Sequence, residues 1–153
     1  MPSLLKLEWP IVRELHGAAW RHFESAEVLI SGCSPNSNSA RAAEGIYLGG
    51  YVVECILKAV LFSRTKLARH KALEKECIQE IQHDLEKLKL RLERLRKHPI
   101  VLPLEHSRQL RFVRNLWHPR MRYINRTWVA EDAKDFLMAS EGILKFACGE
   151  GDT

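Results

Sequence analysis

The chain has 153 residues, of which 46% are hydrophobic and 28% charged, the balance of an ordinary globular domain with enough residues for one core. Its net charge of +5 favours polyanionic partners without establishing nucleic-acid binding. No uninterrupted apolar run reaches the roughly 18 residues that span a bilayer, the start lacks the layout of a signal peptide, and the cysteines form no C-x-x-C pair. We therefore expect one cytoplasmic domain over residues 1–153, with no membrane segment, a core at about 10–148 and frayed ends.

The first predicted helix begins at Pro10, because proline suits the first turn of a helix. Apolar residues then recur at helical spacing, and Gly32 provides a stop signal. His16 and His22 flank the apolar face, where a histidine is more often packed than functional. The polar stretch at 32–39 predicts a loop.

The longest apolar segment, residues 41–64, predicts a helix that is buried on both sides. At 100° per residue its apolar side chains cover one face and also nearly the opposite face, so this helix should form the centre of the domain. The Gly49–Gly50 pair costs roughly 1 kcal/mol per glycine against alanine, which is tolerated where another backbone approaches closely. One narrow polar stripe interrupts the apolar surface, and its groups need partners if they are buried. The stripe consists of Tyr47, Tyr51, Glu54 and Lys58.

The next apolar pattern runs from Ile78 to Leu95 with the spacing 3-4-3-4-3. It covers too few heptads for a coiled coil and predicts a bundle helix with one core stripe. The sequence leaves open whether this helix is continuous through His83-Asp84 or restarts there. Pro99 ends the helix, because the residue before a proline avoids the α region.

Two further helices complete the pattern. Pro103 opens a helix that runs through Trp117, and Thr127 is the expected N-cap of a last helix. The first turn of that helix carries Glu131 and Asp132, which suit the positive end of the helix dipole. No segment shows the alternation of a strand. The sequence therefore predicts an all-α, up-and-down bundle of four to five helices.

Three segments carry a recognisable motif: residues 47–59 are YLGGYVVECILKA, residues 83–88 are HDLEKL and residues 117–123 are WHPRMRY. The first resembles the central helix of HEPN domains (higher eukaryotes and prokaryotes nucleotide-binding), which often have the pattern Y-L-A-G-Y-A-V-E-C-x-L-K-A. The other two resemble the family's H-[DS]-L-x-x-L and W-x-P-x-x-R-Y segments and follow in the same order. The resemblance covers about residues 15 to 147 and implies a HEPN-like helical bundle that forms a homodimer.

Motifs of several enzyme classes are absent from the sequence. It contains no phosphate-binding G-x-x-x-x-G-K, no G-x-G-x-x-G and no H-E-x-x-H. The single E-x-x-H pair, Glu80 and His83, falls short of the two pairs and two further carboxylates of a di-metal bundle. No serine or cysteine lies in a recognisable nucleophile context. We therefore expect neither a metal nor a cofactor.

Arg111 and His118 fit, at its long limit, the R-x(4–6)-H motif that supplies a metal-independent active site in the ribonuclease members of the family. Seven helical residues return to within about 20° of the same face, so the two side chains would share a surface if the helix reached His118. A histidine could move the proton of an RNA 2′-hydroxyl while an arginine stabilises the phosphate charge. A basic helix also meets this loose spacing by chance, and family members with the W-x-P-x-x-R-Y segment commonly lack the catalytic histidine.

Arg122 and Tyr123 match the family's R-Y pair. One interpretation is a ligand site in which Arg122 binds a phosphate or carboxylate, with Tyr51, Lys58 and Tyr123 close to it. The other, which we favour, is a structural ion pair between Arg122 and Glu54, because an acid and a guanidinium in apolar surroundings lower their free energy by pairing. Lys58, one turn along the central helix, is the alternative partner of Glu54.

The resemblance implies two functions of different classes. The first is a non-catalytic homodimeric module that binds a nucleotide, RNA or a partner protein, such as a nucleotidyltransferase or antitoxin in a toxin–antitoxin or defence system. The second is a metal-independent endoribonuclease toxin that uses Arg111 and His118. The sequence favours the first and leaves enzymatic activity undecided. A dimer that joins two copies of His118 in an open basic cleft would favour the second.

Overall fold

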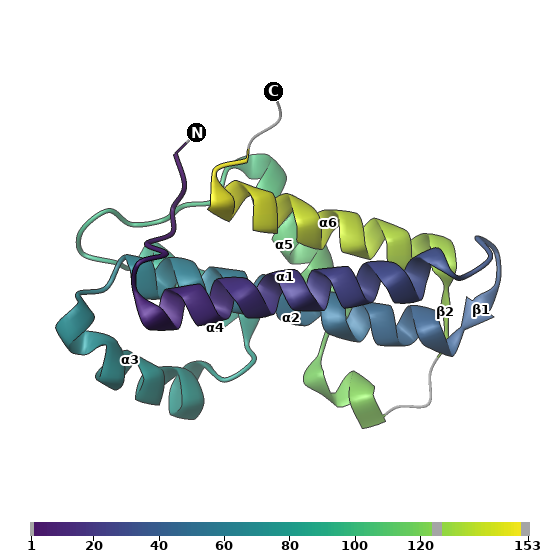
Figure 1. The fold of residues 1–153 in the computed structure, drawn as a ribbon, viewed down its shortest axis with the longest axis horizontal. Coiled ribbons are helices and arrows are strands. Elements are labelled where there is room, and N and C mark those ends of the chain that lie inside the picture. The colour runs from purple at the N-terminus through teal and green to yellow at the C-terminus, as the bar shows by residue number, and fades with distance from the viewer. Residues whose placement is uncertain (1, 124–126, 151–153) are drawn as a thin grey trace.

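The computed structural model describes residues 2–123 and 127–150, and for Arg122 and Tyr123 it describes the backbone alone. Within these ranges the protein is mostly helical, which confirms the all-α class, and it has six α-helices where four to five were expected (Figure 1). The helices are α1 (Pro10–Ser31), α2 (Ala40–Ser63), α3 (His70–Glu76), α4 (Leu85–Glu93), α5 (Leu104–Leu116) and α6 (Ala130–Cys148). Shorter elements are 3-10 turns at Leu67–Arg69 and Pro119–Tyr123, a π-helical turn at Cys77–Ile81, and strands β1 (Asn38–Ser39) and β2 (Trp128–Val129).

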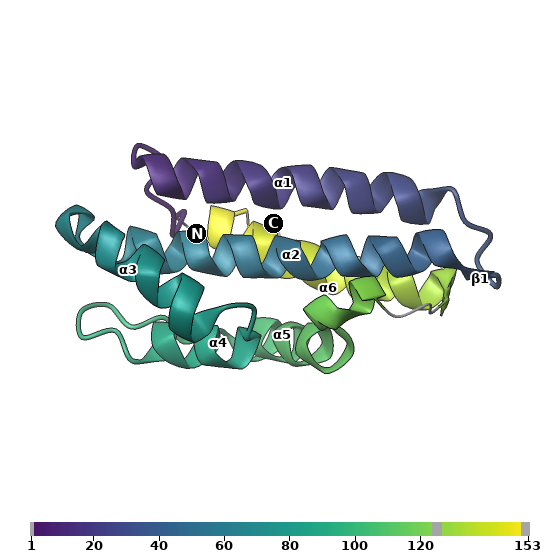
Figure 2. The same cartoon turned by 90° about the horizontal axis from the view of Figure 1, so that it is seen from below.

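Helix α2 is the centre of the molecule, as its two apolar faces predicted. The Ser39 side chain starts it by accepting hydrogen bonds from the backbone N–H groups of Arg41 and Ala42. In Figure 2, α1 lies on one side of α2 and the pair α4 and α5 on the other, and α6 packs along it as well. By length and composition α2 could cross a membrane, but 72% of its most apolar window is buried inside the protein. Such burial is typical of a core helix.

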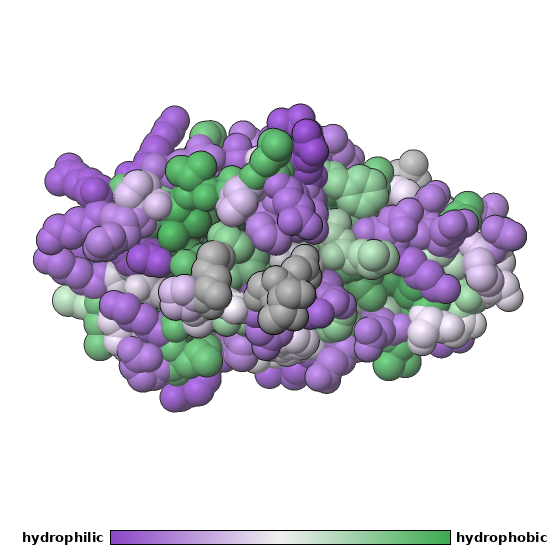
Figure 3. All heavy atoms as spheres, turned by 90° about the horizontal axis from the view of Figure 1, so that it is seen from above, coloured by the Kyte–Doolittle hydropathy of each residue, from purple (hydrophilic) through white to green (hydrophobic). Residues whose placement is uncertain are grey.

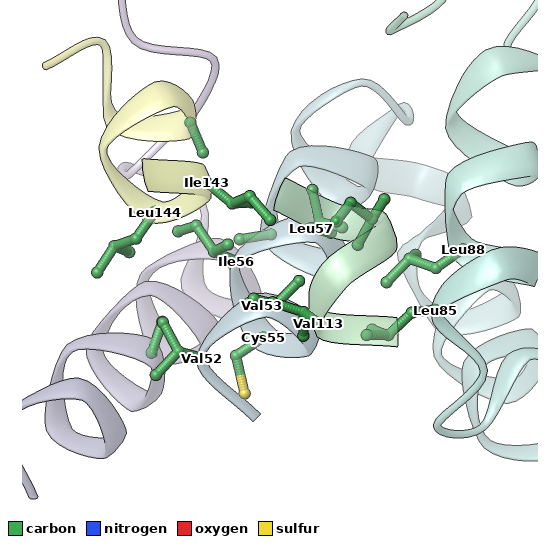
Figure 4. Packing of buried hydrophobic residues seen from close by; sticks show 14 of the residues in the cluster. Val52, Val53, Cys55, Ile56, Leu57, Leu85, Leu88, Val113, Ile143 and Leu144 are labelled. Atoms are coloured by element: carbon green, nitrogen blue, oxygen red, sulfur yellow. The ribbon is translucent and has the colours of Figure 1, made fainter. Parts of the chain in front are cut away.

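The core joins side chains from all six α-helices, and those where α2 meets α4, α5 and α6 lie close together. Figure 4 shows them in one cluster, which includes Val53 of α2, Leu88 of α4, Val113 of α5 and Ile143 of α6. All four are fully buried. Burying a side chain of this size stabilises the fold by about 1.5–3 kcal/mol. The core therefore fixes the ends of α4 and α5 relative to α2.

The apolar pattern from Ile78 to Leu95 does not form one helix. The π-helical turn ends before Gln82, whose φ of 52° and ψ of −120° break the helical path. Asp84 then caps α4 by accepting from two backbone N–H groups of its first turn. The helix thus restarts at His83-Asp84, which settles the alternative that the sequence left open.

The break also corrects the predicted core stripe. Ile78 is 74% exposed, because the π-helical turn and the break place it on a different face from the residues of α4. The apolar residues that follow it in the pattern remain in the core, and Leu95 is half-buried against it. The buried members are Ile81, Leu85, Leu88 and Leu92.

The start of α6 differs from the prediction as well. Its N-cap position is Val129, which has no capping side chain, so Thr127 does not cap this helix. A two-stranded antiparallel pairing that the sequence did not indicate joins Asn38 to Val129 and Ser39 to Trp128. Strands of two residues are too short to show alternation. They connect the beginnings of α2 and α6, next to each other in Figure 1.

Candidate functional site

Glu54 is the buried acid of the polar stripe on α2, with 5% of the residue exposed. One carboxylate oxygen accepts a hydrogen bond of 2.7 Å from Nδ1 of His83, and the other lies 3.5 Å from Nζ of Lys58. The predicted partner Arg122 has a side chain outside the described residues. A buried carboxylate needs such partners, because removing it from water without them costs several kcal/mol. Glu54 therefore links the central helix to the helix break.

Lys58 holds the same break at a second point. Its Nζ donates a hydrogen bond of 2.8 Å to the carbonyl oxygen of Gln82, the residue with positive φ. A non-glycine residue in that region costs of order 1–3 kcal/mol, which surrounding contacts must offset. Glu54 and Lys58 therefore position both Gln82 and His83. Because a carboxylate only accepts, Nδ1 of His83 carries the hydrogen and Nε2 is the acceptor of the neutral ring.

Tyr51, predicted as a ligand-binding residue, lies half-buried among aromatic rings. Its ring centroid is 5.1 Å from those of Tyr47 and Trp117 and 5.8 Å from those of His22 and His83. The hydroxyls of Tyr47 and Tyr51 are 3.3 Å apart. The pairs with Tyr47, His83 and Trp117 are edge-to-face, an arrangement that stabilises a cluster beyond the area it buries. The structure therefore gives Tyr51 a packing role beside His83.

Two titratable groups near Glu54 are shifted by burial. Burial, and then the charge of Arg21, lowers the pKa of His22, while Glu54 raises it by less. Burial raises the pKa of the Cys55 thiol to about 11. A thiol with that pKa stays protonated at neutral pH, where it cannot act as a nucleophile. Cys55 thus contributes packing and not covalent chemistry.

Gly50 allows the indole of Trp117 to lie against α2. A Cβ added to Gly50 would meet atoms of that ring at 2.1 Å. The indole N–H donates a hydrogen bond of 2.9 Å to the carbonyl oxygen of Tyr47. The glycine was expected to admit a backbone, but it admits an aromatic side chain. Trp117 thereby anchors the end of α5 on the central helix.

This anchoring separates His118 from the helix that carries Arg111. Helix α5 ends at Leu116, and Trp117 is extended, with φ of −104° and ψ of 135°. The condition for a shared helical face, a helix that reaches His118, is therefore not met, because Trp117 leaves the helix to pack on Gly50. Arg111 is exposed on α5 and does not line the groove that contains His118.

A groove of about 480 Å³ lies between the helix break and the end of α5. We call it the histidine groove and define it by His83, Lys87, Arg114, His118 and Arg120. These residues come from the break, from α4, from α5 and from the turn after α5. All five are exposed at the surface. The sequence separates them by up to 37 positions, and only the packing of α4 and α5 on α2 brings them together.

Acidic groups at the histidine groove are few and already engaged. Asp84 is the only carboxylate among the lining residues, and it accepts the backbone N–H groups of Glu86 and Lys87. Arg114 forms an ion pair with Glu86. Nζ of Lys87 donates a hydrogen bond of 3.3 Å to the carbonyl oxygen of Glu80. The surface of the groove is therefore positive on balance.

The two histidine rings of the groove have opposite hydrogen-bonding roles. Nδ1 of His118 accepts a hydrogen bond of 3.0 Å from the backbone N–H of Arg120. The hydrogen of the neutral ring is then on Nε2. His83, whose Nδ1 donates to Glu54, has its hydrogen on the other nitrogen. In neutral rings the Nε2 atoms are thus an acceptor on His83 and a donor on His118.

The sequence identified part of this arrangement. It singled out His118, but it gave no ligand role to His83, Lys87 or Arg120. The HDLEKL segment contained the available signal, since it places a histidine before a helix cap and a lysine in the first turn. Arg122 and Tyr123, predicted as ligand-binding, have side chains outside the described part of the chain. Within residues 2–123 and 127–150, no group of three or more His, Cys, Asp or Glu side chains could hold a metal.

Comparison with known proteins assigns this chain to no family. The function must be inferred from the chemistry of the histidine groove and from the resemblance of the motifs. No family model, no curated protein and no solved structure matches this chain.

Proposed function

We propose that this chain is a cytoplasmic, homodimeric, HEPN-like module that binds RNA in the histidine groove without cleaving it. The observation that supports this proposal is the convergence of Lys87, Arg114 and Arg120 around His83 and His118. Arginine forks and lysine ammonium groups are the usual partners of phosphate oxygens. The net charge of +5 adds long-range attraction for a polyanion.

The cations of the groove differ in what they offer to a phosphate. Arg114 shares its guanidinium with Glu86, so its charge is partly neutralised. Lys87 and Arg120 form no ion pair with an acid in the described part of the chain. These two side chains should therefore provide most of the affinity. Because both are exposed, the affinity should fall as salt increases.

A binding titration tests the proposal. Fluorescence anisotropy with a labelled single-stranded RNA should show saturable binding to the parent protein. The double variant Lys87→Gln, Arg120→Gln should bind at least about tenfold more weakly, since each lost charged contact is worth about 1 kcal/mol or more. Lys75→Gln is the matched control, because Lys75 is exposed on α3 and does not line the groove. Equal affinity of the parent and the double variant would refute binding at this groove.

A metal-independent ribonuclease is the second candidate, and one observation favours it. The carboxylate of Glu54 accepts the Nδ1 hydrogen of His83, an arrangement that presents Nε2 as a base. His118 presents a donor to the same groove, where it could bind a phosphate oxygen. The candidate pair is then His83 and His118, in place of Arg111 and His118.

Incubation of the protein with mixed RNA and a chelator separates the two candidates. Under our proposal the RNA stays intact, and His118→Ala changes nothing in this assay. Ribonuclease activity would appear as cleavage that survives the chelator. The single variants His83→Ala and His118→Ala would then each lose nearly as much cleavage activity as the double variant, because the effects of residues that act as a unit are not additive.

The proposed homodimer is supported by apolar side chains on the outside of the bundle. Leu104 and Phe112 on α5 and Met138 on α6 are exposed, and α5 packs on α6. Figure 3, which shows one face of the molecule, has hydrophobic groups between hydrophilic ones. Exposed apolar groups favour a protein–protein contact when they lie together. The resemblance adds a nucleotidyltransferase or antitoxin as a proposed partner, and a nucleotidyltransferase encoded beside this chain would support that part.

A further inference from the structure

A second groove, of about 560 Å³, lies where the N-terminal segment crosses the C-terminal end of α2. The segment is fixed there by two hydrogen bonds. The backbone N–H of Leu4 donates to the carbonyl oxygen of Ala147 at 2.9 Å, and that of Lys6 donates to Oγ of Ser63 at 3.0 Å. We call this site the strap groove and define it by Lys6, Trp9, Arg64, Lys66, Lys97 and His98. It shares no lining residue with the histidine groove.

The charges that line the strap groove are all positive. Four cationic side chains line it, and no aspartate or glutamate is among its lining residues. Like charges in one concave surface repel each other and concentrate counter-ions. The partial negative charge at the C-terminal end of α2 offsets part of this repulsion. An anionic ligand would offset the rest. The four cations are Lys6, Arg64, Lys66 and Lys97.

Arg64 provides an independent sign of a ligand. Its Nε is buried and has no hydrogen-bond partner among the described residues. A buried donor without an acceptor costs free energy, and each one in a native structure calls for an explanation. By contrast, Nε of Arg91 donates to the carboxylate of Glu76 at 2.8 Å. Arg64 also lines the groove, so an anion bound there would pair with its guanidinium charge.

Contacts within the protein itself fix the walls of the groove. Nε2 of His70 lies 2.9 Å from the carbonyl oxygen of Phe62 and 3.0 Å from that of Thr65, and as the donor to both it holds the turn that carries Arg64. Nζ of Lys6 lies 4.5 Å from the ring centroid of Trp9, a cation–π contact. The groove is therefore shaped before any ligand arrives.

The backbone that lines the groove at Lys97 and His98 is constrained. His98 has a φ of 52°, in the left-handed region, and lies directly before Pro99. A non-glycine residue in this region persists only where its surroundings hold it, and such residues gather at ligand sites. Lys97 and His98 both line the groove. Their backbone thus places a lysine and a histidine in the same groove as Arg64.

We propose that the strap groove binds a small oligophosphate, a chain of two or three phosphate groups. One phosphate group carries a charge of about −1.5 to −2 at neutral pH, so four cations match two or three groups better than one. Lys6 covers one face of the Trp9 ring, so a base could stack only on the other face. The ligand is inorganic oligophosphate or the oligophosphate part of a nucleotide.

Isothermal titration calorimetry tests this site on the full chain. Sodium tripolyphosphate should bind saturably with one ligand per chain, and orthophosphate should bind at least about tenfold more weakly because it meets fewer cations. A nucleoside triphosphate is the third titrant. If the nucleoside triphosphate binds as tightly as tripolyphosphate, the site recognises the phosphate chain alone. If it binds more tightly, the ligand is a nucleotide. Either result supports an oligophosphate site.

Variants locate the binding. Arg64→Gln and Lys97→Gln should each weaken tripolyphosphate binding at least about fivefold, because each removes a charged partner. Lys75→Gln and Lys87→Gln each remove one positive charge outside the strap groove, and they should leave the affinity for tripolyphosphate unchanged. Thermal unfolding checks that Arg64→Gln is folded, and Lys97 is exposed, so its variant gives a result even if Arg64→Gln unfolds. Absence of saturable binding, or equal binding by the parent and Lys97→Gln, would overturn the proposal. Loss of tripolyphosphate binding in Lys87→Gln would place the ligand in the histidine groove and would also overturn the proposal.

Discussion

At Gly50 the absence of a side chain determines how closely Trp117 approaches the central helix. We expect Gly50→Ala to lower the free energy of unfolding by about 2 kcal/mol, because the new methyl group would overlap the indole. Alanine's better helix propensity, worth up to about 1 kcal/mol, does not offset this overlap. Urea unfolding measures the change.

Gly17→Ala is the matched control for that substitution. Gly17 also lies within a helix, α1, but a Cβ there would meet only the end of the flexible Arg21 side chain, at 3.3 Å. It should raise the free energy of unfolding by about 0.5–1 kcal/mol. A loss of stability at both glycines would show that packing against Trp117 is not the cause.

Substitution of Glu54 tests whether the polar stripe stabilises the fold. Glu54→Leu should lower the free energy of unfolding by about 2–4 kcal/mol, because it leaves Lys58 without its acid and frees His83 from α2. Glu74→Leu, at an exposed position of α3, should change it by less than about 0.5 kcal/mol. An unchanged thermal midpoint for Glu54→Leu would mean that the acid contributes no net stability.

The burial of Glu54 could be predicted, but its main partner could not. Helical periodicity places Glu54 in an otherwise apolar helix, and that alone implies burial and a need for partners. His83 lies 29 positions away, beyond an irregular turn, so no spacing rule connects the two residues. The same reason explains why Lys87, which lies 31 positions before His118, was not recognised as its neighbour.

At the scale of elements, the break between the π-helical turn and α4 creates the histidine groove. Gln82 has the backbone conformation that glycine adopts most easily. Gln82→Gly should therefore raise the free energy of unfolding by about 0.5–1 kcal/mol, since relief of strain exceeds the entropic cost of glycine. Differential scanning calorimetry would show a higher midpoint.

Gln79→Gly provides the comparison for the break. Gln79 is exposed within the π-helical turn, where glycine should cost about 0.5–1 kcal/mol. If both variants lower the midpoint, the positive φ of Gln82 carries no strain. The contact with Lys58 would then hold the break without having to overcome backbone strain at Gln82.

The end of α5 shows where periodicity fails. Leu110, Val113 and Trp117 are buried, at the spacing of one helical face. The spacing could not show that Trp117 leaves the helix to lie on Gly50, because that contact joins residues 67 positions apart. The shared helical face expected for Arg111 and His118 is absent, because α5 ends before His118. The Thr127 cap failed similarly, since the β1–β2 pairing determines where α6 begins.

At the scale of the whole molecule, the proposed homodimer makes a direct prediction. Sedimentation velocity at micromolar concentration should give a dimer, and Met138→Lys should shift it towards monomer, because a charge at an apolar contact is costly. Ile78→Lys is the control, since Ile78 is equally exposed but lies on the π-helical turn and not on α5 or α6. A parent protein that sediments only as monomer would refute the homodimer.

The two grooves bring cationic side chains together at two separate places in the molecule. The histidine groove joins the helix break to the end of α5, and the strap groove joins the N-terminal segment to the end of α2. The all-α class and the central helix follow from the sequence pattern. The grooves do not, because each depends on segments that only the packed core brings together.

The salt dependence of RNA binding tests the central claim, that the histidine groove binds RNA through its cations. For single-stranded RNA, a plot of the logarithm of the association constant against the logarithm of the salt concentration has a slope of about −0.7 for each phosphate contact. Three cations predict a slope of about −2 for the parent, and Lys87→Gln combined with Arg120→Gln should reduce its magnitude by about 1.4. Arg64→Gln, in the strap groove, should leave the slope unchanged. A slope that the double variant retains, or that Arg64→Gln reduces instead, would contradict RNA binding at the histidine groove.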